Sequence, residues 1–387
     1  MRRAVDDDGS SGRFLLTGSA TPNTAPTHSG ADRIVSVRMR RLSLAERLDR
    51  PPTVSLTDLL SGRQSPLGGA TAFTVSHDAE EIVLSGFPGM GGLTERASRA
   101  QLDGYVTRIV QREFVEYAGH AVRNEGALRR WLTAFAAATS TTASYETIRD
   151  AATAGDAHKP AKSTTIPYRS TLERLWIIDE VPAWLPSHNH LRRLATSPVH
   201  QLADPAIAAR LLGVTASSLL ENTPTAVPIP RDGTLLGALF ESLVTLSVRV
   251  YAQAAEAMVG HLRTRGGEHE IDLIAERADG RVVAIEVKLS RTVDDNDVRH
   301  LRWLQRQLGP NVLDAIVVTT GTEAYRRRDG IGVVPAALLG PWGFGSRSST
   351  PATPPSAAPL TKGNPGWPQR HGRPRNPSTV DAIHAGA

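Results

Sequence analysis

The sequence predicts an α/β protein with a helical middle section and a compact α/β domain in its last third. Three observations favour this fold class. A long apolar helix pattern at 235–259 precedes the β-branched segment VVAIEVKL at 282–289. A second helix pattern at 297–308 and a further strand pattern at 315–319 follow it. Between 144 and 185, two short helix patterns precede the apolar run LWIIDEV, the outline of a small winged-helix-like module.

Composition sets the broad class. The 387 residues are enough for two or three domains, each with its own core. The formal net charge of +5 permits nucleic-acid binding without selecting it. Cysteine is absent, so disulfides and thiolate metal ligands are excluded, which suits a reducing cytoplasm. Charged residues interrupt the apolar stretch at 235–259, and three aspartates stand near the N-terminus where a signal peptide is apolar. We therefore expect a cytoplasmic protein that does not associate with a membrane.

The N-terminal section combines strand and helix patterns. Strands are predicted at 13–17 and 33–37, and the segment LSLAER then starts a helix. In that segment Ser43 and Glu46 have the spacing of a capping box. Further amphipathic helices are predicted at 102–117 and 127–137.

The winged-helix-like segment has two interpretations. If it contacts DNA, Thr164, Thr165 and Tyr168 form its reading surface. Alternatively, it is a packing unit or a protein-contact unit. The partner is therefore DNA or another protein.

The polar residues of the last third are organised by a predicted hairpin. Strand alternation divides each predicted strand into two rows that face opposite sides of the sheet. In the second strand one row is Val283, Ile285, Val287 and Leu289, and the other is Val282, Ala284, Glu286 and Lys288. In the first strand the apolar row is Ile271, Leu273 and Ala275, and the polar row is Glu270 and Asp272. A three-residue loop with Gly280 in the left-handed region would pair Asp272 with Glu286 and Glu270 with Lys288. A two-residue turn would instead set Asp272 opposite the core residue Val287, so face matching favours the longer loop.

This hairpin predicts a metal site. Two facing carboxylates repel each other unless a hard cation lies between them, and Mg²⁺ or Mn²⁺ held by Asp272 and Glu286 would meet that need. Such a metal activates water against a phosphodiester, while Lys288 acts as the catalytic base or steadies the developing charge. Glu241 is a supporting acid near the start of the long helix. It lies off the core stripe of Leu239, Leu243, Leu246 and Val250. The alternative is a half-buried hairpin whose polar face is only solvated.

The order of helical Glu, strand Asp and strand Glu-x-Lys resembles that of the PD-(D/E)xK nuclease superfamily. The resemblance implies a restriction-endonuclease-like fold. It also implies that the catalytic candidates are Glu241, Asp272, Glu286 and Lys288. A wider resemblance extends from residue 2 to about residue 342. The segments GRFLLTGSA, LERLWIIDEVP, ATSPVHQLADPAIA, GALFESLV, EIDLI and IEVK resemble prokaryotic AAA-type ATPases. Those proteins carry a winged-helix segment and a C-terminal nuclease-like domain of unknown function.

The chain departs from that family at its N-terminal end. Family members begin with a strand, a phosphate-cradling Gly-rich loop and an acidic magnesium-binding strand. The pattern GxxxxGK[ST] does not occur here, since GFPGMGGLTE at 86–95 has glycines without the lysine. Ser19 falls at the nucleotide-sensing position as a remnant. The resemblance therefore implies an N-terminally truncated member that neither binds nor hydrolyses ATP.

Four segments result from these interpretations. They are a truncated ATPase-domain remnant with a helical lid at 1–118, a winged-helix-like segment at 119–224, a PD-(D/E)xK nuclease-like domain at 225–342 and a disordered Pro/Ser-rich tail at 343–387. We expect a DNA-associated protein whose C-terminal domain binds or cleaves nucleic acid with a divalent metal. The competing hypothesis is a non-enzymatic remnant that binds a partner. We also expect the residues before about Leu102 to be the least stable, because the strand at 13–17 lacks its neighbours.

Overall fold

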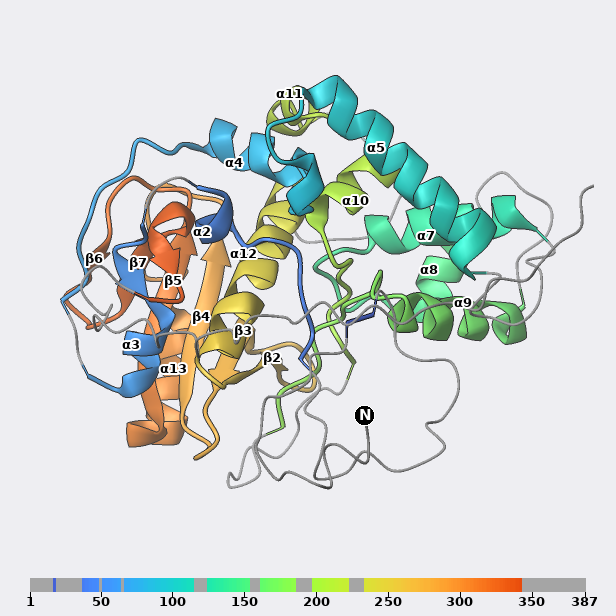
Figure 1. Ribbon diagram of the computed structural model, residues 1–387. Coiled ribbons are helices and arrows are strands. Elements are labelled where there is room, and N and C mark those ends of the chain that lie inside the picture. Colours follow the sequence, from blue (N-terminus) through green and yellow to red (C-terminus); the bar gives the residue numbers. More distant parts are fainter. Residues whose placement is uncertain are drawn as a thin grey trace, which may run out of the picture. The chain divides into compact units, whose positions relative to one another are not determined.

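The computed structural model describes residues 17–18, 37–48, 51–63, 66–114, 124–153, 161–185, 197–222 and 233–342. All of them belong to one compact unit. The predicted α/β class is confirmed, because the structure combines a mixed sheet with helices (Figure 1). Ser19, nearly all of the two predicted N-terminal strands, and the tail lie outside the described residues.

The C-terminal part is built on a six-stranded sheet in the order β2-β3-β4-β5-β7-β6. Its strands are β2 (Met258–Arg263), β3 (Glu270–Glu276), β4 (Val282–Lys288), β5 (Val312–Thr319), β6 (Tyr325–Arg326) and β7 (Gly332–Pro335). The strands β2, β3 and β4 form an antiparallel meander, whereas β4, β5 and β7 are parallel. The predicted strand at 315–319 is the end of β5.

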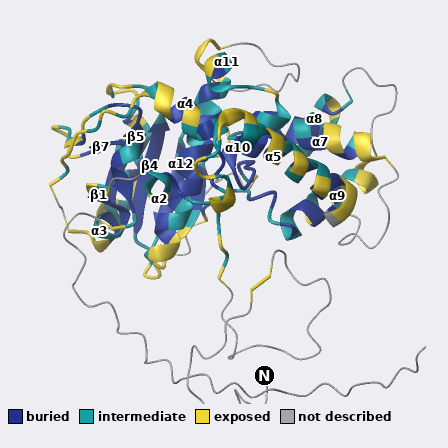
Figure 2. Cartoon of the chain, turned by 45° about the horizontal axis from the view of Figure 1, so that its top comes forward, coloured by how far each residue is buried: buried dark blue, intermediate teal, exposed yellow. Residues whose placement is uncertain are grey.

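Two helices cover opposite faces of this sheet (Figure 1). Helix α12 (Leu235–Ala254) shares its core with Val283 and Ile285, and helix α13 (Arg299–Leu308) shares a second core with Val282 and Ala284. Strand alternation therefore follows the prediction, but both faces of β4 are buried. Figure 2 shows α12, β4 and β5 in the colour of buried residues.

Helix α12 is long and apolar enough to span a membrane by length and composition alone. Within its most apolar window, however, 67% of the residues are buried inside the protein. This burial is that of a core helix and is consistent with a soluble protein.

The hairpin of β3 and β4 has the predicted register. Leu273 pairs with Ile285 and Glu276 with Val282, so the same register sets Asp272 opposite Glu286. The loop closes with Gly280 at φ 79°, a left-handed conformation that glycine adopts without steric cost. The three-residue loop therefore places both acids on one face of the sheet.

Residues 43–61 pack onto the C-terminal sheet and α12. This stretch contains α2 (Leu44–Arg47), β1 (Val54–Ser55) and α3 (Leu56–Ser61), and β1 pairs in parallel with β8 (Leu339–Gly340). The predicted capping box is present, because the carboxylate of Glu46 accepts the backbone N–H of Ser43 at 2.7 Å. Side chains of α12 accept the next two N–H groups, from Leu44 and Ala45.

The prediction that residues before about Leu102 are the least stable stays a prediction. Within that range, however, Leu44, Leu56 and Leu59 are fully buried. The predicted instability rested on the strand at 13–17, whereas the segment after it has a partner surface of its own in α12 and β8.

Short helices form the middle of the chain. They are α4 (Val75–Val83), α5 (Glu95–Arg108), which continues as a π-helix (Ile109–Glu113), α7 (Glu125–Ala137), α8 (Tyr145–Ala151), α9 (Lys162–Arg174), α10 (Pro205–Leu211) and α11 (Ala216–Leu220). Helix α7 matches the helix predicted at 127–137. Helix α5 begins earlier than the predicted 102, because Thr94 caps it by accepting the N–H of Ala97.

Two helices are present where helix patterns were predicted between 144 and 185. Helices α8 and α9 are followed by two isolated bridges, Ile178 with Leu202 and Val181 with Val199, in place of a full strand. Tyr168 is only 6% exposed and packs edge-on against Phe114 and Trp131. The prediction that Tyr168 lies on a DNA-reading surface is therefore wrong, because its ring packs in the core between α9 and α7. Thr164 is exposed and Thr165 is partly exposed.

Candidate functional site

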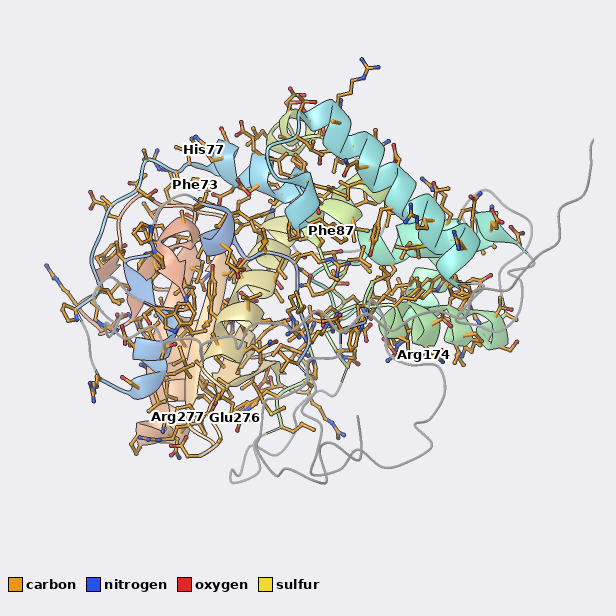
Figure 3. All side chains as sticks on the ribbon, viewed as in Figure 1. Phe73, His77, Phe87, Arg174, Glu276 and Arg277 are labelled. Carbon is orange, nitrogen blue, oxygen red and sulfur yellow. The ribbon has the colours of Figure 1, made fainter. Side chains whose placement is uncertain are left out.

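The candidate site lies at the open end of the β3–β4 hairpin. Because the strands are antiparallel, the start of β3 and the end of β4 meet there, away from the turn that Glu276 and Arg277 mark in Figure 3. Asp272 comes from β3, and Glu286 and Lys288 come from β4. The structure brings these three predicted residues together.

Hydrogen bonds hold the three side chains. The ammonium Nζ of Lys288 donates to Oε1 of Glu286 at 2.7 Å, and the backbone N–H of Val287 donates to Oδ2 of Asp272 at 2.7 Å. Glu286 is 4% exposed, and its other oxygen, Oε2, is buried without a hydrogen-bond partner among the described residues. The burial of Glu286 argues against the alternative of a merely solvated hairpin face.

Burial and mutual repulsion disfavour the charged carboxylates. Burial raises the pKa of Glu286 well above its usual value, the charge of Asp272 raises it further, and Lys288 opposes both. Burial also raises the pKa of Asp272, against Lys288 and the N–H of Val287. Although burial opposes the charge of Lys288, the attraction of Glu286 and Asp272 raises its pKa above the ordinary lysine value.

Glu241 of α12 belongs to the same electrostatic group. Burial raises its pKa well above the usual value, and the charges of Asp272, Glu286 and Glu270 add to that effect. A hydrogen bond with Ser140, which follows α7 in a left-handed conformation at φ 58°, opposes it. The four predicted residues therefore act on one another, and three carboxyl groups share the site with one lysine, which is hydrogen-bonded to Glu286.

This donor set fits a hard divalent cation. Mg²⁺ is commonly held by one or two carboxylates, with waters completing the octahedron. Asp272 and Glu286 supply two carboxylates in one register position, and the unpartnered Oε2 of Glu286 offers a ligand atom. Within the described ranges, no cluster of three acidic, His or Cys side chains could hold a metal ion. A cation here would depend on two carboxylates and water.

Residues that the sequence did not single out flank this site. His269 precedes β3 and stacks on Trp303 of α13 with ring centroids 4.1 Å apart, and its Nδ1 lies 3.2 Å from Nδ1 of His300. Burial lowers the pKa of His300 to about 4, with further lowering from Arg299, His269 and Lys288. Because His269 directly precedes β3, this aromatic and imidazole group lies at the same end of that strand as Asp272. A histidine directly before EIDLI was the available sequence signal.

Two domain families match parts of the chain. Residues 236–339 match the Domain of unknown function DUF4143, and residues 78–218 match the Domain of unknown function DUF8612. The first range contains all four predicted site residues, and DUF4143 is often found with AAA ATPases. Searches of curated proteins and of solved structures gave no match. The two descriptions assign no activity.

Proposed function

We propose that the C-terminal domain carries a divalent-metal-dependent nuclease site, in which Asp272 and Glu286 are the ligands of Mg²⁺ or Mn²⁺. The observation that carries this proposal is the pairing of the carboxyl groups of Asp272 and Glu286 at the open end of the hairpin, with Oε2 of Glu286 buried and unpartnered among the described residues. Buried carboxylates that lack enough cations are stabilised by a bound metal.

The site residues have distinct roles in this proposal. When bound, the metal polarises a phosphoryl oxygen and lowers the pKa of a coordinated water. Lys288 is a third exposed and bonded to Glu286, so its ammonium is placed to hold a phosphate oxygen beside the ligands. Glu241 is the supporting acid of the site: burial and the charges of Asp272, Glu286 and Glu270 raise its pKa, so its protonated form, which can donate a hydrogen bond, is favoured relative to an exposed glutamate.

The arrangement of elements supports a restriction-endonuclease-like fold. A long helix, a three-stranded antiparallel meander with the Asp and Glu-x-Lys residues, a crossover helix and a parallel strand follow one another as α12, β2, β3, β4, α13 and β5. This order supports the resemblance to the nuclease superfamily. It also supports a relationship of this domain to those that accompany AAA-type ATPases.

Nucleotide binding is not part of the proposal. The Gly-rich segment at 86–95 follows the helix α4, and its Pro88–Met90 turn leads into α5. A phosphate loop instead connects a strand to a helix and carries a lysine that reaches the phosphates. We therefore propose no ATPase activity for this chain.

Thermal melts with and without millimolar Mn²⁺ test the metal site. The full chain is required, since β1 pairs with β8 and a fragment from residue 225 would lack that strand. We expect Mn²⁺ to raise the Tm of the wild type and not that of Asp272→Asn, because only a native site binds the ion. Asparagine keeps an acceptor for the N–H of Val287, so the variant removes charge with little loss of structure.

Asp279→Asn is the matched control, since Asp279 lies in the turn of the same hairpin and pairs with surface arginines. It should keep the full Mn²⁺ shift. Equal melting points with and without Mn²⁺ in the wild type would end the metal proposal.

A cleavage assay on single- and double-stranded oligonucleotides then separates the two remaining functions. Activity that Asp272→Asn and Lys288→Met abolish supports the nuclease. A metal-dependent Tm shift without cleavage of DNA or RNA would instead favour a binding module that keeps a vestigial site.

A further inference from the structure

Three arginine side chains converge on one buried aspartate far from the hairpin turn. Arg38 donates to Oδ1 of Asp179 at 2.6 Å, Arg40 donates to Oδ2 at 3.2 Å, and NH2 of Arg249 lies 2.9 Å from Oδ1. The side chain of Asp179 is 7% exposed, and those of the arginines are 20%, 13% and 13% exposed. We call these three arginines with Asp179 the arginine cluster.

The arginine cluster joins three distant segments. Arg38 and Arg40 come from the extended stretch 37–43, Asp179 lies between the two isolated bridges, and Arg249 is on α12. Arg38 is also stacked over the ring of Trp176, with its guanidinium carbon 4.3 Å from the ring centroid. This contact is a cation–π interaction that helps to hold the Arg38 guanidinium in place.

The positive charges of the arginine cluster are not balanced within the described residues. Arg40 makes a further bond to the neutral amide of Gln253, and Arg249 donates to the backbone carbonyls of Asp179 and Glu180. The carboxylate of Glu180 is engaged instead by His200, Tyr145 and Arg169. Three guanidinium groups therefore share a single carboxylate.

The protein bears an electrostatic cost for this arrangement. Burial lowers the pKa of Arg38 to about 10, against the attraction of Asp179, and its neighbours Arg40, Arg249 and Arg41 lower it further. The pKa of Arg249 is also lowered, by burial and by Arg40. Charged groups that are partly removed from water need a counter-charge to be stable.

Two other sets of ion pairs, by contrast, are balanced. Arg326 and Asp314 form a one-to-one bidentate pair, with N···O distances of 2.9 Å and 2.6 Å. Arg302 and Arg327 share two aspartates at the surface. The arginine cluster differs from these pairs by its surplus of two positive charges.

We propose that Arg38, Arg40 and Arg249 form a binding site for a phosphate group. Guanidinium groups match phosphate oxygens by paired N–H donors, and two or three of them together neutralise a phosphate. The same chemistry is offered by the backbone of a polynucleotide and by the phosphate of a free nucleotide. The site does not depend on the metal site and would be filled whether or not the hairpin cleaves anything.

Melting points in inorganic phosphate and in chloride at equal ionic strength test the site directly. Phosphate should raise the Tm of the wild type, since it binds only the native state. Arg38→Gln/Arg40→Gln should lose this increment. Arg63→Gln/Arg306→Gln, which removes two exposed arginines and the same charge, should keep it.

Asp179→Asn supplies the opposite change. It removes the carboxylate that competes for the arginines, so the phosphate increment should be larger than in the wild type. A purely structural cluster predicts the same small phosphate effect in all four proteins, and that result would overturn the proposal. If the double glutamine variant melts at too low a temperature to compare, Arg40→Gln alone should also reduce the phosphate-induced rise in Tm, by a smaller amount.

A labelled single-stranded oligonucleotide identifies the source of the phosphate. If the ligand is a polynucleotide, Arg38→Gln/Arg40→Gln should weaken binding and reduce the slope of log affinity against log salt by about 1.4, or about 0.7 per lost contact. Unchanged oligonucleotide affinity, together with a phosphate increment that the variant loses, would assign the site to a free nucleotide or phosphate.

Discussion

Helix α12 carries one charged residue into each of two clusters whose imbalances are opposite. Glu241 reaches the hairpin site, where carboxylates outnumber the lysine bonded to them. Arg249, about 12 Å further along the axis, reaches the arginine cluster, where three guanidinium groups share one carboxylate. The ligands proposed for the two clusters therefore have opposite signs: a divalent cation for the first and a phosphate for the second.

A third buried cluster shows what a balanced network looks like. His200 is 1% exposed, with one ring nitrogen 2.7 Å from the carboxylate of Glu180 and the other 2.7 Å from the carbonyl of Ala143. The hydroxyl of Tyr145 donates to the same carboxylate, and Arg169 lies over the ring of Tyr145. Here the charges find partners inside the protein. We assign this network to the packing of the winged-helix-like segment.

Removing the shared carboxylate of the arginine cluster should have the largest effect. Asp179→Ala leaves three guanidinium groups without their acceptor, and breaking a buried ion pair in this way costs about 3 to 5 kcal/mol. Urea unfolding in a chloride buffer measures this loss, and part of it should return when phosphate replaces chloride.

Asp279→Ala provides the comparison, since Asp279 also accepts from two arginines but lies at the surface. Its effect should fall within the range of ordinary surface substitutions. Similar losses in the two variants would show that burial does not distinguish the arginine cluster.

A single buried acid extends the comparison of the two clusters to a carboxyl group outside both of them. Asp78 in α4 is 2% exposed, and its Oδ1 has no hydrogen-bond partner in the described part of the chain. Burial raises its pKa to about 7, and Glu81 contributes. Because this folded-state value lies above the unfolded one, the protonated group stabilises the fold below about pH 4, and this stability is lost as the pH rises to about 7.

The free energy of unfolding of Asp78→Asn should therefore exceed that of the wild type by up to about 4 kcal/mol at pH 8 and by little at pH 4. A shift of about three pKa units corresponds to that energy. Denaturant melts at the two pH values give the difference. If the advantage of Asp78→Asn does not grow with pH, the carboxyl is ionised in the native state and has a partner.

The hairpin could be predicted from the sequence because its signals are local. Period-two alternation and Gly280 set the register across a loop of three residues, and that register brings Asp272 and Glu286 together. The arginine cluster has no such signal. Arg38 and Asp179 are 141 positions apart, and nothing in either neighbourhood marks the other.

The same limit applies to the two-residue pairing of β1 with β8, which joins Val54 to Leu339. Tyr168 illustrates a different failure. Its position on α9 suited both a DNA-reading surface and a core, and only the packing of Phe114 and Trp131 against it decides between them.

The corresponding experiment at the hairpin site removes a positive charge instead of a negative one. Lys288→Met removes the ammonium bonded to Glu286 and leaves the buried carboxylates facing each other. Because Lys288 is a third exposed, we expect a loss of about 2 kcal/mol, below the full value for a buried pair. Millimolar Mn²⁺ should recover more stability in this variant than in the wild type, since the ion no longer competes with the lysine.

An equal Mn²⁺ increment in wild type and Lys288→Met would mean that the lysine and the ion do not share Glu286. In that case the surplus of carboxylates would be neutralised by protons alone, and the parallel between the two clusters would fail on the acidic side.

The smallest expected effect concerns the other surface where nucleic acid was predicted to bind. Thr164 of α9 is exposed, but its neighbour Tyr168 faces the core, so the predicted reading surface is reduced to the threonines. Thr164→Ala should change stability by less than about 0.5 kcal/mol and oligonucleotide affinity by less than about twofold. Fluorescence anisotropy beside Arg38→Gln/Arg40→Gln provides the measurement. A larger loss from Thr164→Ala than from the arginine pair would move the nucleic-acid contact to α9, and the arginine cluster would then need a different phosphate.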